Sequence, residues 1–431
     1  MKFLLHSHFP AGHAYPMQAV AQALVARGHD VVWLTSADNE ARVRAAGAAF
    51  VATQAIASVD APLMRENATG LFDTRHRRLG RRMEAQVADY RAVLEGFRPD
   101  VLLVDVLPHG ARALHELGEM PVYATLGVIP LYSSTSNAPL PGSGECPPTS
   151  WLGVLVNAMR QALNRWVVFP LLLRPVINHQ RASLGLRGLP YGEPQEYFAY
   201  SPHLHLQASS RTLEFSQDPR PAQHRYHTAY VGPLVTCIRP AATSNDLPTW
   251  WPEVVSHERV IGITQGTLAM DPTSLIVPSV KALQDEPGTL LLVVSPHTKE
   301  IESRTGNPSN VRLAEWLPYH LLLPQLRLLI TNGGYGSITQ ALSHKVPLLC
   351  AGQSEDKRDT AARVVWAGVG IDLKTDTPSP DQVRVAARQI LNDKGYQATA
   401  QRLGDELNSL GGSERACDCL EALATAATTC F

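Results

Sequence analysis

Short apolar runs alternate along this chain with longer stretches in which apolar residues recur every three or four positions. Residues 2–6 form one such run, residues 17–25 show the helical spacing and end at Gly28, and residues 31–35 form the next run. Two buried strands joined by a helix are the repeating unit of a parallel β-sheet. The N-terminal segment is therefore expected to fold as strand, loop, helix and strand, with residues 9–13 as the loop because they contain Pro and Gly.

The same alternation continues in two series separated by a polar stretch. The first series adds expected strands at 101–105, 122–125, 204–208 and 230–231, and the second has them at 260–264, 290–295, 328–331 and 347–350. Residues 239–258, between the series, are rich in Pro, Ser, Asn and Trp, which is typical of a linker. The pattern predicts an α/β fold with two doubly wound, Rossmann-like domains facing across a ligand-binding cleft. The expected boundaries are 1–238 for the N-terminal domain, 239–258 for the linker, 259–410 for the C-terminal domain and 411–431 for a final helix.

The composition agrees with a multi-domain globular protein and excludes several classes. A chain of 431 residues, 45% of them hydrophobic, is too long for one hydrophobic core. Lys and Arg number 38 against 39 for Asp and Glu, so the excess of basic residues that a general nucleic-acid binder needs is absent. The 6 cysteines are scattered without a Cys-x-x-Cys pair, which favours reduced thiols and a cytoplasmic protein.

A membrane-spanning segment is not expected either. The apolar run at the N-terminus is too short for a signal peptide. The most apolar stretch, residues 151–177, is interrupted by three arginines and two prolines, whereas a membrane span needs about 20 apolar residues in succession. We expect this stretch to form a helical wall around an apolar pocket, with contact at a membrane surface as the minor alternative.

The most informative motif is a glycine-rich turn, Asn332-Gly-Gly-Tyr-Gly-Ser337, between an apolar strand and a helical pattern that starts at Ile338. Glycines let the backbone approach a ligand closely, and the first turn of a helix offers unpaired N–H groups at its positive dipole end. This arrangement suits a diphosphate. By itself, the turn is equally compatible with an ordinary connection between a strand and a helix.

Two flanking segments favour the ligand-binding interpretation. Trp316 follows an expected strand end, where an indole can stack on a nucleobase. Asp356 and Lys357 follow the strand after the turn, and their side chains can accept from and donate to sugar hydroxyls. The loop after the first strand of this half, which contains Gly266 and Thr267, is expected to add a second phosphate contact.

These motifs together resemble the nucleotide-sugar signature of the family 1 glycosyltransferases, which have the GT-B fold, in the form found in bacterial and fungal natural-product enzymes. The resemblance implies that Trp316 stacks on the base, that Leu317 offers its main chain to it, and that UDP-glucose is the default donor. It also implies that the final helix packs back on the N-terminal domain. Asn332 stands where a phosphate-binding His is commonest in the family, and Gln340 where a ribose-binding Glu is typical. The expected donor-binding residues are Gly266, Thr267, Trp316, Leu317, Asn332, Gly334, Tyr335, Gly336, Ser337, Gln340, Asp356 and Lys357.

The N-terminal half supplies candidates for a general base. Transfer of a sugar to a hydroxyl needs a group that takes the proton, and a histidine held by a carboxylate is suited to this near neutral pH. His13 lies in the segment Gly12-His-Ala-Tyr-Pro16, and Asp105 ends an expected strand of the same sheet. An isolated loop histidine is more often structural, but the resemblance also implies a base at His13 oriented by Asp105. Gly12 and His109 are expected to contact the acceptor.

The remaining acceptor contacts are expected from residues 61–82, 127–141 and 151–177, which are apolar, Pro-rich or helical. The chain contains no Asp-x-Asp, the pair with which many other sugar transferases hold a divalent metal, so we expect no metal and no other cofactor. The sequence thus predicts an inverting transferase that moves a hexose to a hydroxyl of a small apolar acceptor. A NAD-dependent oxidoreductase is excluded because no Gly-x-Gly-x-x-Gly opens the first helix. A sugar-nucleotide epimerase or hydrolase, and a catalytically silent homologue, remain as alternatives.

Overall fold

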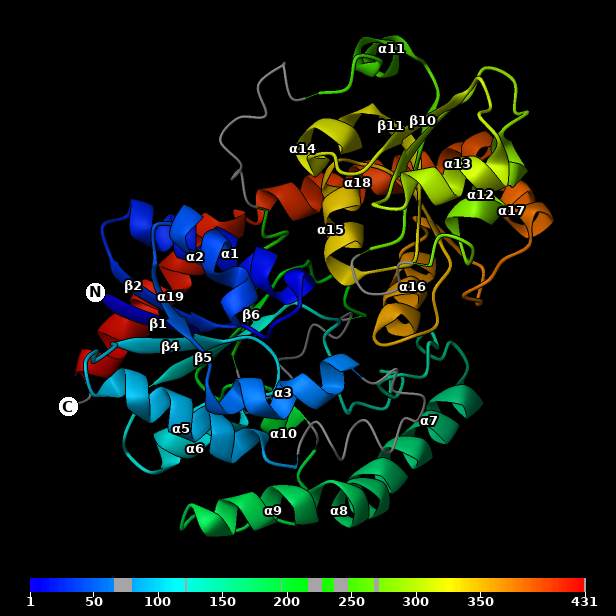
Figure 1. Cartoon of the computed structure of the whole chain (residues 1–431). Helices are drawn as coiled ribbons and strands as arrows, with labels where there is room; N and C mark the ends of the chain where they lie inside the picture. Colours follow the sequence, from blue (N-terminus) through cyan, green and yellow to red (C-terminus); the bar gives the residue numbers. More distant parts are fainter. Residues whose placement is uncertain are drawn as a thin grey trace.

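The computed structural model describes residues 1–65, 80–120, 122–194, 196–215, 227–235, 247–266 and 271–429. It contains two parallel β-sheets, each covered by helices on both faces, and the two units meet along one side (Figure 1). The doubly wound α/β fold with two facing sheets, expected from the alternating pattern, is confirmed. Leu and Val dominate the central strands because those strands are buried on both faces.

The first sheet has seven strands in the order β3-β2-β1-β4-β5-β6-β7, and every neighbouring pair is parallel. The order reverses between β1 and β4, which creates a switch point where ligands typically bind. His6 pairs with Val104 there, so the residues that follow these two strands are neighbours. The strands are β1 (Lys2–His6), β2 (Asp30–Thr35), β3 (Ala49–Ala52), β4 (Val101–Val104), β5 (Tyr123–Gly127), β6 (Leu204–Gln207) and β7 (Thr228–Tyr230).

The second sheet has six strands in the order β10-β9-β8-β11-β12-β13, again all parallel. Its switch point lies between β8 and β11, where Thr264 pairs with Thr331. The loop that contains Gly266 is therefore adjacent to Asn332. The strands are β8 (Val260–Thr264), β9 (Leu290–Val294), β10 (Val311–Ala314), β11 (Leu326–Thr331), β12 (Leu348–Cys350) and β13 (Gly370–Asp372).

Helices cover both faces of each sheet and bury four apolar clusters against them. In the N-terminal half they are α1 (Ala11–Ala26), α2 (Glu40–Ala45), α3 (Ala55–Arg65), α5 (Arg82–Leu94), α6 (His109–Glu116), α7 (Trp151–Leu163), α8 (Phe169–Leu172), α9 (Arg174–Ser183) and α10 (Glu196–Ala199). In the C-terminal half they are α11 (Trp251–Ser256), α12 (Ile276–Leu283), α13 (Thr298–Thr305), α14 (Tyr319–Leu322), α15 (Tyr335–Ser343), α16 (Lys357–Trp366), α17 (Pro380–Asn392) and α18 (Lys394–Ser409), and the chain ends with α19 (Gly412–Thr429).

The last helix returns to the first sheet. Helix α19 lies beside α1 (Figure 1), and its residues Cys417 and Leu420 are buried in the same cluster as Phe3 and Leu24. Arg27, just after α1, makes ion pairs with three carboxylates of α19, those of Glu414, Asp418 and Glu421, at 2.6–3.1 Å. The chain therefore crosses between the two halves a second time through α18 and α19.

The structure differs from the sequence predictions in one loop, in the expected linker and at edge strands. Residues 9–13 are not all loop, because α1 begins at Ala11 after the extended residue Pro10, whose fixed φ suits a helix start. Of the expected linker 239–258, the structure describes residues 247–258, which include α11, and Trp250 and Trp251 there pack against the second core. Strands β3 and β13 were not expected, since they lie at sheet edges and are only partly buried, which weakens their apolar pattern.

Candidate active site

The carboxyl ends of the two sheets border a cleft of about 750 Å³ whose lining comes from both halves of the chain. The N-terminal unit contributes the start of α1, including Gly12 and His13, and apolar residues such as Val128 and Ile129. The C-terminal unit contributes Trp316 and the starts of α15 and α16. Among the described residues, none from 151–177 lines this cleft, so α7–α9 do not form its wall.

His13 and Asp105 come together at the switch point of the first sheet. His13 is in the first turn of α1, directly after β1, and Asp105 directly follows the neighbouring strand β4. The His13 Nδ1 atom lies 2.9 Å from Asp105 Oδ2, and the backbone N–H of His8 donates to the same carboxylate oxygen at 2.9 Å. Because a carboxylate only accepts, Nδ1 of His13 carries the proton, which leaves Nε2 of the neutral ring as a base. The Asp105 side chain is 2% exposed and that of His13 is 20% exposed.

Several carboxylates around His13 favour its charged form. Burial lowers the pKa of His13, but the hydrogen bond and the charge of Asp105 raise it, with help from Asp356 and Glu355 across the cleft. The net result is a His13 pKa above the ordinary value of 6.5. This direction is useful for a base that takes a proton from a hydroxyl, because a higher pKa makes Nε2 the better proton acceptor.

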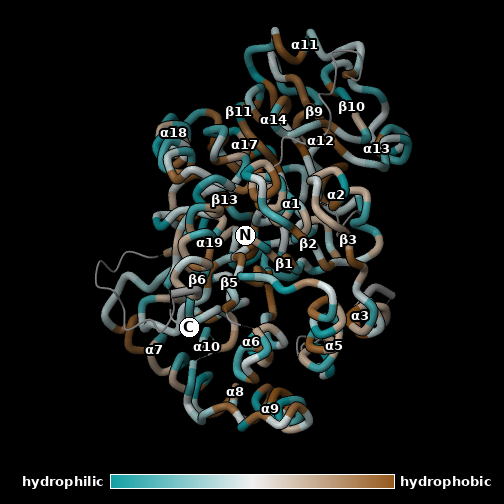
Figure 2. Tube along the Cα trace, turned by 90° about the vertical axis from the view of Figure 1, so that its left-hand side faces the viewer, coloured by the Kyte–Doolittle hydropathy of each residue, from teal (hydrophilic) through white to brown (hydrophobic). Residues whose placement is uncertain are grey.

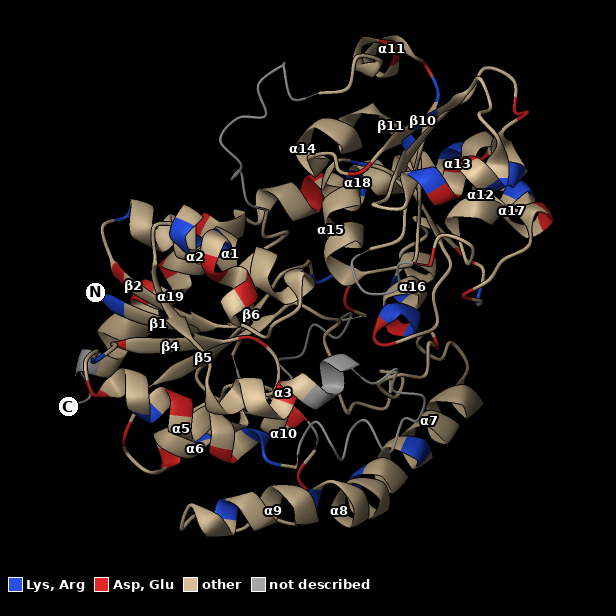
Figure 3. Ribbon diagram, viewed as in Figure 1, with Lys and Arg blue, Asp and Glu red and all other residues tan. Residues whose placement is uncertain are grey.

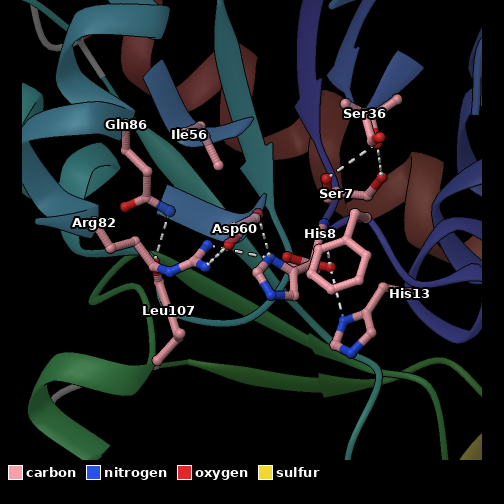
Figure 4. Close-up of polar contacts among 12 residues, drawn as sticks. Ser7, His8, His13, Ser36, Ile56, Asp60, Arg82, Gln86 and Leu107 are labelled. Atoms are coloured by element: carbon pink, nitrogen blue, oxygen red, sulfur yellow. Dashed lines mark hydrogen bonds and ion pairs between the residues drawn. The ribbon is translucent and has the colours of Figure 1, made fainter. Parts of the chain in front are cut away.

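A second polar cluster lies next to His13 and was not anticipated. The His8 ring meets the His13 ring edge-on, with centroids 5.5 Å apart, and Arg82 bonds both His8 Nδ1 and the carboxylate of Asp60 (Figure 4). Arg82 is 1% exposed, so this pair is fully buried at the start of α5. Because Arg only donates, His8 Nδ1 must accept, which fixes the tautomer of this neighbouring ring. Sequence spacing gave no signal for the cluster, since Asp60 and Arg82 approach only when α3 packs on α5.

The glycine-rich turn forms the N-terminus of α15 on the opposite side of the cleft. Gly334 is the N-cap residue, and no side chain caps the helix, so its first N–H groups are available to an anion. Gly333 has φ +88°, a conformation that favours glycine. A Cβ atom added at Gly334 or Gly336 would meet nothing within 4 Å, so the space above the turn is open. Ser337 Oγ lies 3.4 Å from the hydroxyl of Tyr319.

The second expected phosphate loop lies directly beside this turn. Gly266 has φ +75° and faces the amide of Asn332, which a Cβ on Gly266 would approach to 3.2 Å. Asn332 Nδ2 donates to the carbonyl of Gln265, so it holds the two loops together, and Asn332 Oδ1 has no hydrogen-bond partner among the described residues. Thr267 lies outside the described residues.

The other expected donor contacts also border the cleft. Trp316 is 45% exposed there, whereas the Leu317 side chain is buried in the core beneath it. Lys357 Nζ is buried and donates to Ser354 Oγ at 3.0 Å and to Glu355 at 2.7 Å. Asp356 is the N-cap residue of α16, and burial raises the pKa of its carboxyl. Gln340 Nε2 donates back to the carbonyl of Gly336 at 3.1 Å.

Tyr335 has a role that the sequence did not reveal. Its backbone belongs to the first turn of α15, but its hydroxyl is buried and bonds the carboxylate of Glu214 and the amide of Gln207, both from the N-terminal half. Arg363 of α16 donates to the same Glu214 at 2.9 Å and to the carbonyl of Leu131 at 2.6 Å. The cluster therefore fixes the glycine-rich turn to the other half of the molecule.

The two expected acceptor contacts differ in position. Gly12 lies exposed at the cleft, with open space around it. His109 is buried at the start of α6 and is not among the described residues that line the cleft. Burial and the nearby Arg112, Arg82 and Arg181 lower the pKa of His109 to about 4, so its ring is neutral at pH 7.

The assembled site has a helix N-terminus without a side-chain cap on one side of the cleft and a histidine–carboxylate pair on the other. Comparison with known proteins identifies the class to which the chain belongs. Residues 291–422 match the family model described as "Erythromycin biosynthesis protein CIII-like, C-terminal domain". The chain is 34% identical to the 4'-demethylrebeccamycin synthase of Lentzea aerocolonigenes over 96% of its own length and 97% of that protein. It is 29% identical to the UDP-glucosyltransferase A1 of Starmerella bombicola, over 93% and 87% of the two chains.

Solved structures extend the likeness to the fold. The glycosyltransferase of kitacinnamycin superposes with a TM-score of 0.72 at 21% identity, over 98% of both chains. The spinosyn rhamnosyltransferase SpnG in complex with thymidine diphosphate gives a TM-score of 0.67 at 24% identity, over 98% of this chain and 100% of that one. The chain belongs to the family 1 UDP-glycosyltransferases and has their GT-B fold. It is a glycosyltransferase of the natural-product type.

Proposed function

We propose that this enzyme transfers glucose from UDP-glucose to a hydroxyl of a small, largely apolar acceptor with inversion at the anomeric carbon. His13 is the general base and Asp105 orients it. The observation that carries the proposal is the 2.9 Å contact between His13 Nδ1 and Asp105 in a cleft whose opposite side is the uncapped N-terminus of α15.

The geometry supports a single displacement. The acceptor oxygen attacks the anomeric carbon while the bond from that carbon to the diphosphate oxygen breaks, and the hydroxyl proton passes to His13 Nε2. UDP leaves with the bonding electron pair, and the N–H groups of Gly336 and Ser337 together with the dipole of α15 stabilise the charge that develops. The attack comes from the face opposite to the leaving group, so the configuration inverts.

The donor assignment depends on three features of the C-terminal half. Trp316 offers an exposed indole to a base, α15 offers amide donors to a diphosphate, and Asp356 with Lys357 offers polar groups to sugar hydroxyls. The relatives named as UDP-glucosyltransferases, such as that of Starmerella bombicola, support UDP and glucose. Val128, Ile129 and Leu234 on the N-terminal side of the cleft support an apolar acceptor.

We further propose that the reaction needs no metal ion, because the chain has no Asp-x-Asp and backbone amides can hold the diphosphate. The test is an assay of UDP release from UDP-glucose with a panel of hydroxylated apolar compounds, with and without EDTA. UDP release that requires acceptor and resists EDTA is the expected result. UDP release that is independent of acceptor would instead indicate a hydrolase, and sensitivity to EDTA would contradict the metal-free mechanism.

A further inference from the structure

An apolar helical face on the outside of the N-terminal half has no role in the cleft. Helix α7 continues through a π-helical turn (Asn164–Val168) into α8, and the resulting rod lies along the edge of the molecule (Figure 1). Large apolar side chains of this rod are exposed to solvent, and those from Leu152 to Trp166 recur every three or four residues. We call them the α7–α8 face: Trp151, Leu152, Leu155, Met159, Leu163, Trp166 and Leu171.

The polarity of α7 is inverted relative to an ordinary surface helix. Its buried residues are Asn157 and Gln161, whose amides donate to the backbone carbonyls of Ser136 and Ala138 at 2.7–2.8 Å. Trp151 is 79% exposed and Met159 is 65% exposed on the outer side. A surface helix normally turns its apolar residues to the core. Hydrogen bonds thus hold α7 in place while a contiguous apolar patch is left to the outside, and such patches mark interaction sites.

The charges of this region have one sign. Residues 147–192 contain five arginines and no Asp, Glu or Lys. Figure 3 shows blue positions without red along α7, α8 and α9. Arg165 and Arg174 donate to the backbone carbonyls of Gly192 and Leu189, and their guanidinium groups lie over the rings of Trp166 and Tyr191. These partners are neutral, and neither arginine pairs with a carboxylate in the part of the chain that the structure describes. Arg160 and Arg181 do pair with carboxylates, those of Glu145 and Glu116 outside the segment.

The apolar side chains and the arginines together indicate which kind of partner can cover the α7–α8 face. A second copy related by twofold symmetry would bring two arginine-rich segments of the same sign together. A bilayer with anionic lipids can bind both the arginines and the apolar side chains. Arginines contact the headgroups, while Trp, Leu and Met enter the interface. Among the described residues, no helix is long and apolar enough to cross a bilayer, so the contact is at the surface. Figure 2 shows the brown, apolar colouring of α7 and α8 at this side of the molecule.

We propose that the α7–α8 face binds the surface of an anionic lipid bilayer. Trp151 and Trp166 lie in the headgroup region, and Leu155, Met159 and Leu163 reach the start of the acyl chains. The inference does not depend on the identity of donor or acceptor, because none of these residues lines the cleft.

The test is co-sedimentation of the full chain with vesicles of phosphatidylglycerol and phosphatidylcholine in equal parts, and with vesicles of phosphatidylcholine alone. A double variant, Leu155→Glu with Met159→Glu, places two charges at exposed positions that make no core contact. The matched control is Val385→Glu on α17, an equally exposed apolar residue (67%) far from the face. Circular dichroism and the melting temperature show whether each variant is folded, and Leu171→Glu, at a position 69% exposed, is the second variant if the double variant fails to fold.

The expected result is binding to the anionic vesicles, with weaker binding at high salt and to the neutral vesicles. The double variant should reduce partitioning roughly tenfold or more, whereas Val385→Glu should leave it unchanged. Absence of binding by the unmodified chain, or equal loss in both variants, would overturn the proposal. A dimer of the unmodified chain, measured by light scattering and lost in the double variant, would overturn it in favour of a second copy as the occupant.

Discussion

At the scale of single residues, the most consequential contact is that between His13 and Asp105. Substitution of His13 by Ala removes the proposed base, so kcat should fall by about 10²–10⁴, the usual range for general base catalysis. The Kd for UDP, measured by calorimetry, should stay nearly unchanged because the donor contacts lie across the cleft. His257→Ala, away from the cleft, is the control. Near-normal turnover in His13→Ala would contradict the assignment.

The contact between His13 and Asp105 should also determine how the rate depends on pH. His13 must be neutral to accept a proton, so the rate falls as pH decreases through its pKa. Because that pKa is raised, the acid limb of the kcat profile should lie above pH 6.5. In Asp105→Asn the hydrogen bond to a charged group and its Coulomb attraction are lost, so the limb should shift to lower pH while kcat falls. An unshifted limb would show that another group controls the profile.

At the scale of elements, a substitution at the start of α15 should affect the stability of the protein and its binding of the donor in different ways. Gly336→Asp adds a negative charge in the first turn, where it interacts favourably with the helix dipole. The same charge repels a diphosphate, and two unit charges about 4 Å apart interact by about 4 kcal/mol near a protein surface. The melting temperature should therefore not fall, while the Kd for UDP should rise at least tenfold, or about 1.4 kcal/mol.

Calorimetry with UDP and thermal melting measure the two effects separately. Gln382→Glu adds a negative charge to the first turn of α17 and keeps its capping geometry, so it serves as the control without an effect on UDP. If Gly336→Asp bound UDP normally, the diphosphate would not lie at the α15 N-terminus.

At the scale of the whole molecule, Glu214 connects the two halves. It accepts from Tyr335 and Arg363 of the C-terminal half, and both Glu214 and Arg363 are buried. Glu214→Gln leaves the Arg363 charge without its carboxylate, which typically costs about 3–5 kcal/mol for a buried pair. The free energy of unfolding in urea should fall by about that amount.

Glu300→Gln is the matched control for this loss, since it breaks an exposed pair with Arg304 and should change the unfolding curve little. Because Tyr335 also belongs to the α15 turn, Glu214→Gln should weaken UDP binding as well. A stability close to that of the unmodified chain would mean that the halves are held together by other contacts.

The sequence predictions were most accurate where burial imposes a clear apolar pattern on the chain. Central strands such as β1, β8 and β11 were predicted nearly to the residue, because burial on both faces imposes an uninterrupted apolar run. Edge strands such as β3 were missed because partial burial leaves no such run. Residues 11–13 were predicted to be loop but form the first turn of α1, because the local Pro and Gly favour a turn as much as a helix start.

What the sequence determined by itself is the order of strands and helices and the residues that follow each strand, because these depend on periodicity and local backbone preference. The proximity of His13 and Asp105 followed from that order, since neighbouring strands of a parallel sheet bring their carboxyl ends together. Only the tertiary structure decided the partners that are distant in the chain. Glu214 reaches Arg363, Asp60 reaches Arg82, and the apolar side of α7 faces outward, because packing between elements sets these arrangements and no local pattern encodes it.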